Sequence, residues 1–141
     1  MSIIGLILFV IHIGAFIAGG ANLVLMPVVG PRMAKASPAG REELQRVVGA
    51  VAKIGKYAMV TLLVTGVLVL WLKWDFVIPN VWFWVKMAGI VGMLVCIGIN
   101  ETNFKKAKAG DAEAAKRTKM FGQLTGVFFA IVLVAAVFAF N

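Results

Sequence analysis

Four long apolar runs dominate the hydropathy pattern of this chain of 141 residues, and polar segments separate them. The apolar runs cover residues 3–29, 54–72, 81–100 and 120–140. A helix of about 20 residues, rising 1.5 Å per residue, crosses the roughly 30 Å hydrocarbon core of a bilayer. The pattern therefore predicts an all-α fold. We expect a four-helix transmembrane bundle that forms a single domain over residues 1–141, with loops at 30–53 and 101–119.

The second helix is expected to begin well before its apolar run. Ser37 is a good N-cap residue, and Pro38 suits the first turn of a helix because the N–H that it lacks would have no partner there. We therefore expect a helix that starts near Ser37 and leads into residues 54–72.

The composition is typical of a membrane protein. The chain is 62% hydrophobic, has a mean hydropathy of +0.97, and carries only 14% charged residues, whereas soluble domains carry about 25%. Most of the formal net charge of +8 lies in the polar segments, and we find no motif that reads a nucleic-acid groove. We therefore predict membrane lipid as a partner and no nucleic acid.

The basic residues also predict how the helices are oriented. Two segments hold nearly all of them: Arg32, Lys35, Arg41, Arg46, Lys105, Lys106, Lys108, Lys116, Arg117 and Lys119. The positive-inside rule then makes loops 30–53 and 101–119 cytoplasmic, with both termini on the outer (periplasmic) side of a prokaryotic plasma (inner) membrane. The remaining turn is flanked by the residues of an interfacial belt, Trp71, Trp74, Trp82 and Trp84. Asp75, Pro79 and Asn80 predict that this turn is tight.

Small residues recur at helical spacing in three of the runs, and such residues let helices approach closely in lipid. The predicted stripes are Ala15, Ala18 and Gly19; Gly89, Gly92 and Cys96; and Gly122, Gly126 and Ala130. We expect these stripes to be helix contacts, and we interpret Cys96 as a small core residue.

Ionisable groups inside a bilayer are costly and are therefore candidates for function. His12, the only histidine, lies about 12 Å from the outer end of its run, and Lys86 lies about 9 Å from the outer end of its own. Thr65 has a matching depth, and Thr61 is one turn deeper on the same face. These four residues are predicted to converge. The alternatives stay open: His12 as a hydrogen-bonded packing residue, and Lys86 as a lysine that reaches the interface.

A second polar layer is predicted near the cytoplasmic side, formed by Asn22, Lys53, Lys56, Asn100, Glu101 and Gln123. Arg46, Lys53 and Lys56 follow spacings of seven and three residues. They could hold a carboxylate or a lipid phosphate on one helix face. The alternative for both lysines is an aliphatic stem in lipid with the ammonium group at the interface.

Imidazole is a good axial ligand for haem iron, and His12 is the candidate metal ligand. A second axial ligand would have to be a methionine, Lys86, water, or His12 of a partner chain. Copper needs clustered soft ligands, whereas Met87 and Met93 are six residues apart and do not share a face.

Three motifs resemble a known family. They are "HIGAFIAGG" followed by Pro27, the basic "AKIGKYAMVTLLVTGVLVL", and the aromatic "VWFWVKM". Together with the length and topology, they resemble the small four-helix membrane proteins of the HemJ and CopD group, which includes HemJ-type protoporphyrinogen oxidases and the copper-resistance D domain.

The resemblance implies b-type haem or a porphyrin at His12 and a functionally important, candidate catalytic lysine at Lys86. Thr61, Thr65, Lys53 and Lys56 would complete the cofactor site. The expected role is redox chemistry or electron transfer, and any enzymatic activity would be that of an oxidoreductase. Two alternatives remain: a non-catalytic small subunit or assembly factor of a larger membrane complex, and copper transport or resistance. The expected protein partners are a second copy of this chain, in a homodimer, or a larger membrane complex.

Overall fold

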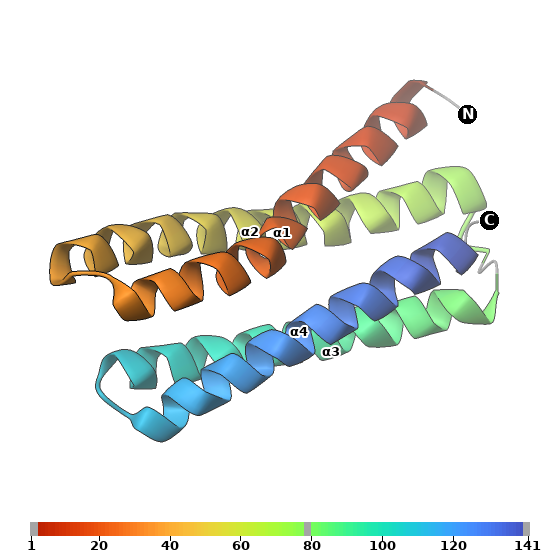
Figure 1. The fold of residues 1–141 in the computed structure, drawn as a ribbon. Helices are drawn as coiled ribbons and strands as arrows, with labels where there is room; N and C mark the ends of the chain where they lie inside the picture. The colour runs from red at the N-terminus through yellow and green to blue at the C-terminus, as the bar shows by residue number, and fades with distance from the viewer. Residues whose placement is uncertain (1–2, 78–79, 140–141) are drawn as a thin grey trace. The chain divides into compact units, whose positions relative to one another are not determined.

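A computed structural model of the chain describes residues 3–77 and 80–139. Four α-helices account for most of them: α1 (Ile3–Lys35), α2 (Pro38–Trp74), α3 (Val81–Lys108) and α4 (Ala112–Ala139) (Figure 1). Each helix is long and apolar enough to cross a membrane, which confirms the predicted helical class. The chain divides into two compact units, residues 1–77 and 78–141, and each contains one helical hairpin.

The helices extend beyond the predicted spans. Segments 30–53 and 101–119 were expected to be loops, but the turns between helices occupy only residues 36–37 and 109–111. The loop prediction was therefore wrong for residues 30–35 and for most of 101–119, whereas the helix expected from Ser37 onward is confirmed over residues 38–53. The Ala, Glu, Lys, Arg and Gln residues of these segments are strong helix formers, so the helices continue after the apolar pattern has ended.

The start of α2 agrees with the prediction. The Ser37 hydroxyl oxygen accepts a hydrogen bond from the Gly40 backbone N–H at 3.2 Å, and Pro38 occupies the first turn. Ser37 is thus a true N-cap, and the turn between α1 and α2 can be short because the helix needs no further residues to satisfy its first donors.

The first unit is an antiparallel pair of α1 and α2. A Cβ atom placed on Gly19 would lie 3.6 Å from the Cβ of Ala58, and the side-chain amide of Asn22 donates to the Val51 carbonyl at 3.3 Å. Ala15 is buried as well. The predicted contact role of Ala15 and Gly19 is therefore confirmed.

The second unit pairs α3 with α4, and two glycines of α3 face side chains of α4 with no room for a Cβ. A Cβ on Gly89 would lie 2.8 Å from Val132 Cγ2, and a Cβ on Gly92 would lie 2.6 Å from Phe128 Cε1. Cys96, on the same face, is buried. The predicted stripe of α3 is confirmed.

The predicted stripe of α4 was wrong for Ala130, which is exposed. The buried positions of α4 instead include Val132, Ala135 and Ala139. A strict spacing of four residues turns about 40° further around the helix at each step, because α-helices have 3.6 residues per turn. A row that starts at Gly122 has therefore left the contact face by Ala130.

The turn between α2 and α3 begins and ends with capping residues. Asp75 adopts a left-handed conformation (φ 45°, ψ 39°), and its N–H caps the last carbonyls of α2. Asn80 caps α3 by accepting from the Trp82 N–H at 3.0 Å, and its side-chain amide donates to the Phe138 carbonyl near the end of α4 at 3.1 Å. Asn80 therefore joins the start of α3 to the end of α4. The predicted role of Pro79 falls outside the described residues.

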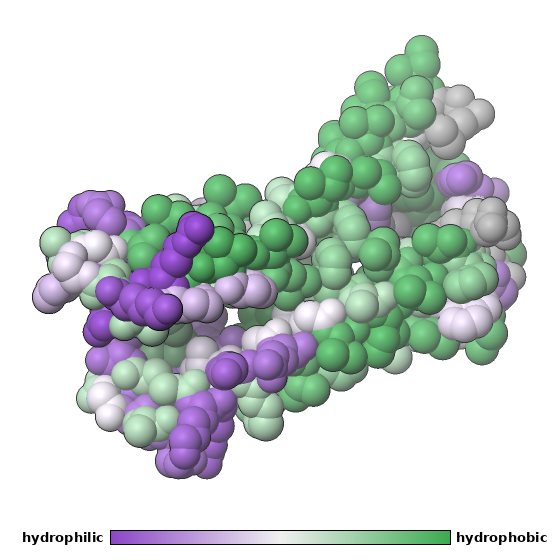
Figure 2. Space-filling model, in the orientation of Figure 1, coloured by the Kyte–Doolittle hydropathy of each residue, from purple (hydrophilic) through white to green (hydrophobic). Residues whose placement is uncertain are grey.

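Large apolar side chains cover the outer faces of the helices. Figure 2 shows each hairpin as hydrophobic along most of its helices and hydrophilic at the turn that joins them. Val24 is 73% exposed and Ile3 is 78% exposed. Helices whose apolar residues face outward in this way suit lipid as their solvent.

Candidate functional site

His12 of α1 contacts α2 through a hydrogen bond in the first unit. Its Nδ1 lies 2.8 Å from the hydroxyl oxygen of Thr65, a buried residue, while the imidazole is half-buried. A Cβ placed on Gly66 would lie 3.4 Å from Cε1 of the ring. Gly66 therefore leaves room for the imidazole to lie against the backbone of α2.

The hydrogen bonds of Thr65 assign the tautomer of His12. The Thr65 hydroxyl oxygen lies only 2.6 Å from the Thr61 carbonyl oxygen, and two oxygens so close need a proton between them. The one hydroxyl proton is therefore donated to Thr61, and the Thr65 oxygen accepts a second hydrogen bond from Nδ1–H of His12. Neutral His12 then carries its proton on Nδ1 and its ring lone pair on Nε2.

The structure thus brings together three of the predicted site residues. His12, Thr65 and Thr61 form one chain of hydrogen bonds, in which Thr61 contributes its carbonyl oxygen. Matching the depth of polar residues in different runs was sufficient to predict this grouping. Gly66 was missed as a contact of the imidazole, although it lies within the quoted motif "AKIGKYAMVTLLVTGVLVL".

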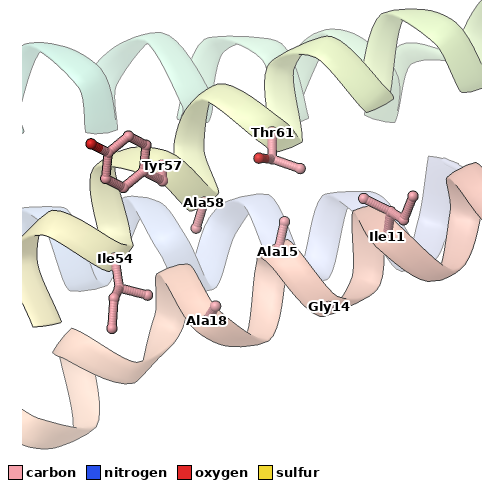
Figure 3. A pocket seen from close by; sticks show the side chains of 8 residues that line it. All are labelled: Ile11, Gly14, Ala15, Ala18, Ile54, Tyr57, Ala58 and Thr61. Atoms are coloured by element: carbon pink, nitrogen blue, oxygen red, sulfur yellow. The ribbon is translucent and has the colours of Figure 1, made fainter.

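A shallow groove of about 360 Å³ lies beside this polar chain on the same two helices. Its lining residues are Ile11, Gly14, Ala15 and Ala18 of α1 and Ile54, Tyr57, Ala58 and Thr61 of α2. Figure 3 shows Ile54 and Tyr57 at one end of the groove and Ile11 at the other, with alanines between them. The groove is apolar except for the hydroxyl groups of Tyr57 and Thr61.

The other predicted site residues lie elsewhere. Lys56 and Lys53 are exposed on α2, about 13 and 18 Å from Thr65 along the helix axis. Lys86 is half-buried on α3, in the second unit. The structure does not test whether Lys53, Lys56 or Lys86 belongs to a cofactor site, so that role stays a prediction.

The predicted cytoplasmic polar layer consists of separate local interactions. In the first unit, the side-chain amide of Asn22 donates a hydrogen bond to the Val51 carbonyl of α2. In the second unit, Glu101 lies 4.0 Å from Lys105 on the same helix, and Gln123 is exposed. Asn100 is half-buried, and its side-chain oxygen accepts no hydrogen bond from the part of the chain that is described.

The donor chemistry at His12 fits haem iron better than copper. A haem-ligating histidine coordinates through one ring nitrogen while a hydrogen bond holds the other, and Thr65 supplies that bond. Within residues 3–77 and 80–139, no group of three or more His, Cys, Asp or Glu side chains is placed to hold a metal ion. A single hydrogen-bonded imidazole such as His12 could supply one axial ligand to haem iron.

In comparisons with known proteins, no protein-family model, no curated protein and no solved structure matches the chain.

Proposed function

We propose that this integral membrane protein binds b-type haem, or a related porphyrin, through Nε2 of His12 and takes part in redox chemistry or electron transfer. The observation that carries the proposal is the hydrogen-bond chain from His12 through Thr65 to Thr61. It supports the proposal, because a neutral His12 that donates from Nδ1 carries its ring lone pair on Nε2.

The surroundings of His12 also favour this function. Bound haem supplies a one-electron iron couple, and its potential depends on the axial ligand, hydrogen bonding to that ligand, and burial. Thr65 controls the hydrogen bond, and the apolar α1–α2 hairpin controls burial. His12 provides one axial position, so the second would come from Lys86, a methionine, water or a second copy of the chain. An associated enzymatic activity would be of the protoporphyrinogen oxidase type, with Lys86 as the candidate catalytic residue.

We further propose that both termini lie on the periplasmic side of a prokaryotic inner membrane. The support is the concentration of lysine and arginine around the α1–α2 and α3–α4 turns. A periplasm-active phosphatase reporter fused to either terminus should be active, while one inserted at residue 110 should be inactive. The reverse pattern would overturn this orientation.

The direct test of haem binding is the absorption spectrum of the purified protein in mild detergent, oxidised and then reduced with dithionite. Haem should be supplied during expression. We expect a Soret band and, after reduction, a distinct α band. A featureless visible spectrum under these conditions would refute the proposal.

Thr65→Val tests the tautomer argument, because valine keeps the branched shape of threonine and removes the hydrogen-bond acceptor. Losing such a partner of a ligating histidine weakens binding by about 10–100-fold. We expect this loss in a haem titration, together with a shifted midpoint potential. Thr118→Val is the matched control, because Thr118 also bonds a carbonyl of its own helix but lies in α4. A Thr65→Val protein with unchanged affinity and potential would contradict the role given to Thr65.

The second candidate is a small subunit or assembly factor of a membrane complex, in which His12 only joins two helices. The same hydrogen bond to Thr65 favours it, since polar side chains commonly link helices in membranes. The two candidates differ in the spectrum: a purely structural His12 predicts no chromophore in any form of the protein.

A further inference from the structure

We propose that the α1–α2 groove binds one acyl chain of an anionic phospholipid, and that Lys53 and Tyr57 hold its phosphate. The groove lies beside the proposed haem site and shares Thr61 with it, but His12 itself does not line the groove, so lipid binding can be tested in protein without haem.

The groove has the chemistry of an acyl-chain site. Its lining is almost entirely apolar, and its floor consists of glycine and alanine residues. A Cβ placed on Gly14 would meet no atom within 4 Å, so the hairpin itself leaves this space open. The groove is shallow, with a volume of about 360 Å³, and has the shape of a surface furrow and not of an enclosed ligand cavity.

A basic residue next to the groove-lining residues of α2 favours an anionic occupant. Lys53 is exposed and stands one turn before Tyr57, which lines the groove and is 76% exposed. Residues four apart are neighbours on a helix surface, so the ammonium and phenol groups can donate to one anion. An uncharged lipid or an apolar partner helix would make no use of the lysine, whereas a phosphate would.

Depth along the helix agrees with a lipid. Lys53 immediately precedes the apolar run 54–72, so it lies where the headgroups of a bilayer begin. From Lys53, Tyr57 and Thr61 follow at intervals of four residues along α2, and Thr61 lies about 12 Å into the hydrocarbon region. A phospholipid has the same order of chemistry, with an anion at the boundary and an apolar chain extending inward.

The neighbouring Lys56 provides a sharp control. With 100° of rotation per residue, Lys53 lies about 90° from the centre of the groove-lining face of α2, and Lys56 lies about 150° from it. The two lysines have nearly the same depth and the same charge. Only Lys53 stands at the flank of the groove.

The test titrates the full-length protein in detergent with phosphatidylglycerol or phosphatidylcholine carrying identical acyl chains, and native mass spectrometry measures each affinity. We expect phosphatidylglycerol to bind about fivefold more tightly, the contribution of one basic residue near a phosphate surface. Lys53→Gln should abolish this preference, and Lys56→Gln should retain it. Equal affinity of the wild-type protein for both lipids, or equal effects of the two substitutions, would overturn the proposal.

Filling the groove tests the acyl-chain part. Gly14→Leu should weaken binding of both lipids by at least about tenfold, the loss expected when about two CH₂ groups are no longer buried. Gly98→Leu is the control, because a Cβ there also meets nothing within 4 Å and Gly98 lies on α3. Ala18→Leu fills the same groove if the Gly14 variant does not fold. Unchanged lipid affinity in the groove variants would overturn an acyl-chain site. So would glycerophosphoglycerol, which has no acyl chains, if it displaced bound phosphatidylglycerol as well as free phosphatidylglycerol does.

Discussion

Replacing His12 with alanine is expected to remove the haem spectrum completely while the helices stay folded. His12 is the only imidazole in the chain, so no other histidine of the same chain can take its place. The measurement compares Soret absorbance per protein, after haem supplementation, with helix content from far-ultraviolet circular dichroism. Ile13→Ala is the matched control, because Ile13 is the next residue of α1 and is 42% exposed.

The outcome separates the two candidate functions. A lost Soret band with unchanged helix content would support ligation by His12, and a full Soret band in His12→Ala would end that assignment. If His12 only joins α1 to α2, no form of the protein absorbs in the visible range. His12→Ala then costs only the interhelical hydrogen bond to Thr65, about 0.6 to 1.7 kcal/mol of unfolding free energy.

Gly92→Leu is expected to cause the largest loss of stability in the α3–α4 hairpin. Even a Cβ at this position would lie within 2.9 Å of three ring atoms of Phe128, so the ring or the helix has to move. Overpacking of this kind costs about 1–3 kcal/mol, and a full leucine side chain belongs at the upper end. Unfolding in mixed detergent micelles, followed by tryptophan fluorescence and circular dichroism, measures the change.

Two comparisons make this prediction specific. Gly98→Leu inserts the same side chain on the same helix, where a Cβ meets nothing within 4 Å, and should leave stability nearly unchanged. Phe128→Ala should relieve the clash. The double variant Gly92→Leu/Phe128→Ala should therefore lose less unfolding free energy than the two single variants lose together. Additive losses would show that Gly92 and Phe128 do not interact in the protein.

The hydropathy pattern was sufficient to predict the helices but not their ends. A bilayer fixes how long an apolar run must be, whereas capping and propensity decide where the backbone stops being helical. Ser37 marked one true end because its capping chemistry is local. The ends of α3 and α4 near residues 109–111 carry no signal in hydropathy, since helix-forming polar residues continue across the membrane boundary.

The candidate site could be predicted in part for a similar reason. Depth counting works along a straight helix, so it placed His12 level with Thr65, with Thr61 one turn deeper. The error at Ala130 has another origin: it was assigned from a strict spacing of four residues, which drifts around the helix and leaves the contact face. Depth counting also cannot recognise Gly66, whose contribution is the absence of a side chain beside the imidazole.

The two short turns, at residues 36–37 and 109–111, also bear on how the chain acquires its fold. The contacts described for each hairpin join helices that follow one another directly, so neither hairpin needs the other half of the sequence to close. Synthesis proceeds from the N-terminus, and early segments fold before later ones exist. The first hairpin can therefore form once residue 77 has left the ribosome, and His12 can meet Thr65 while the second hairpin is still being translated.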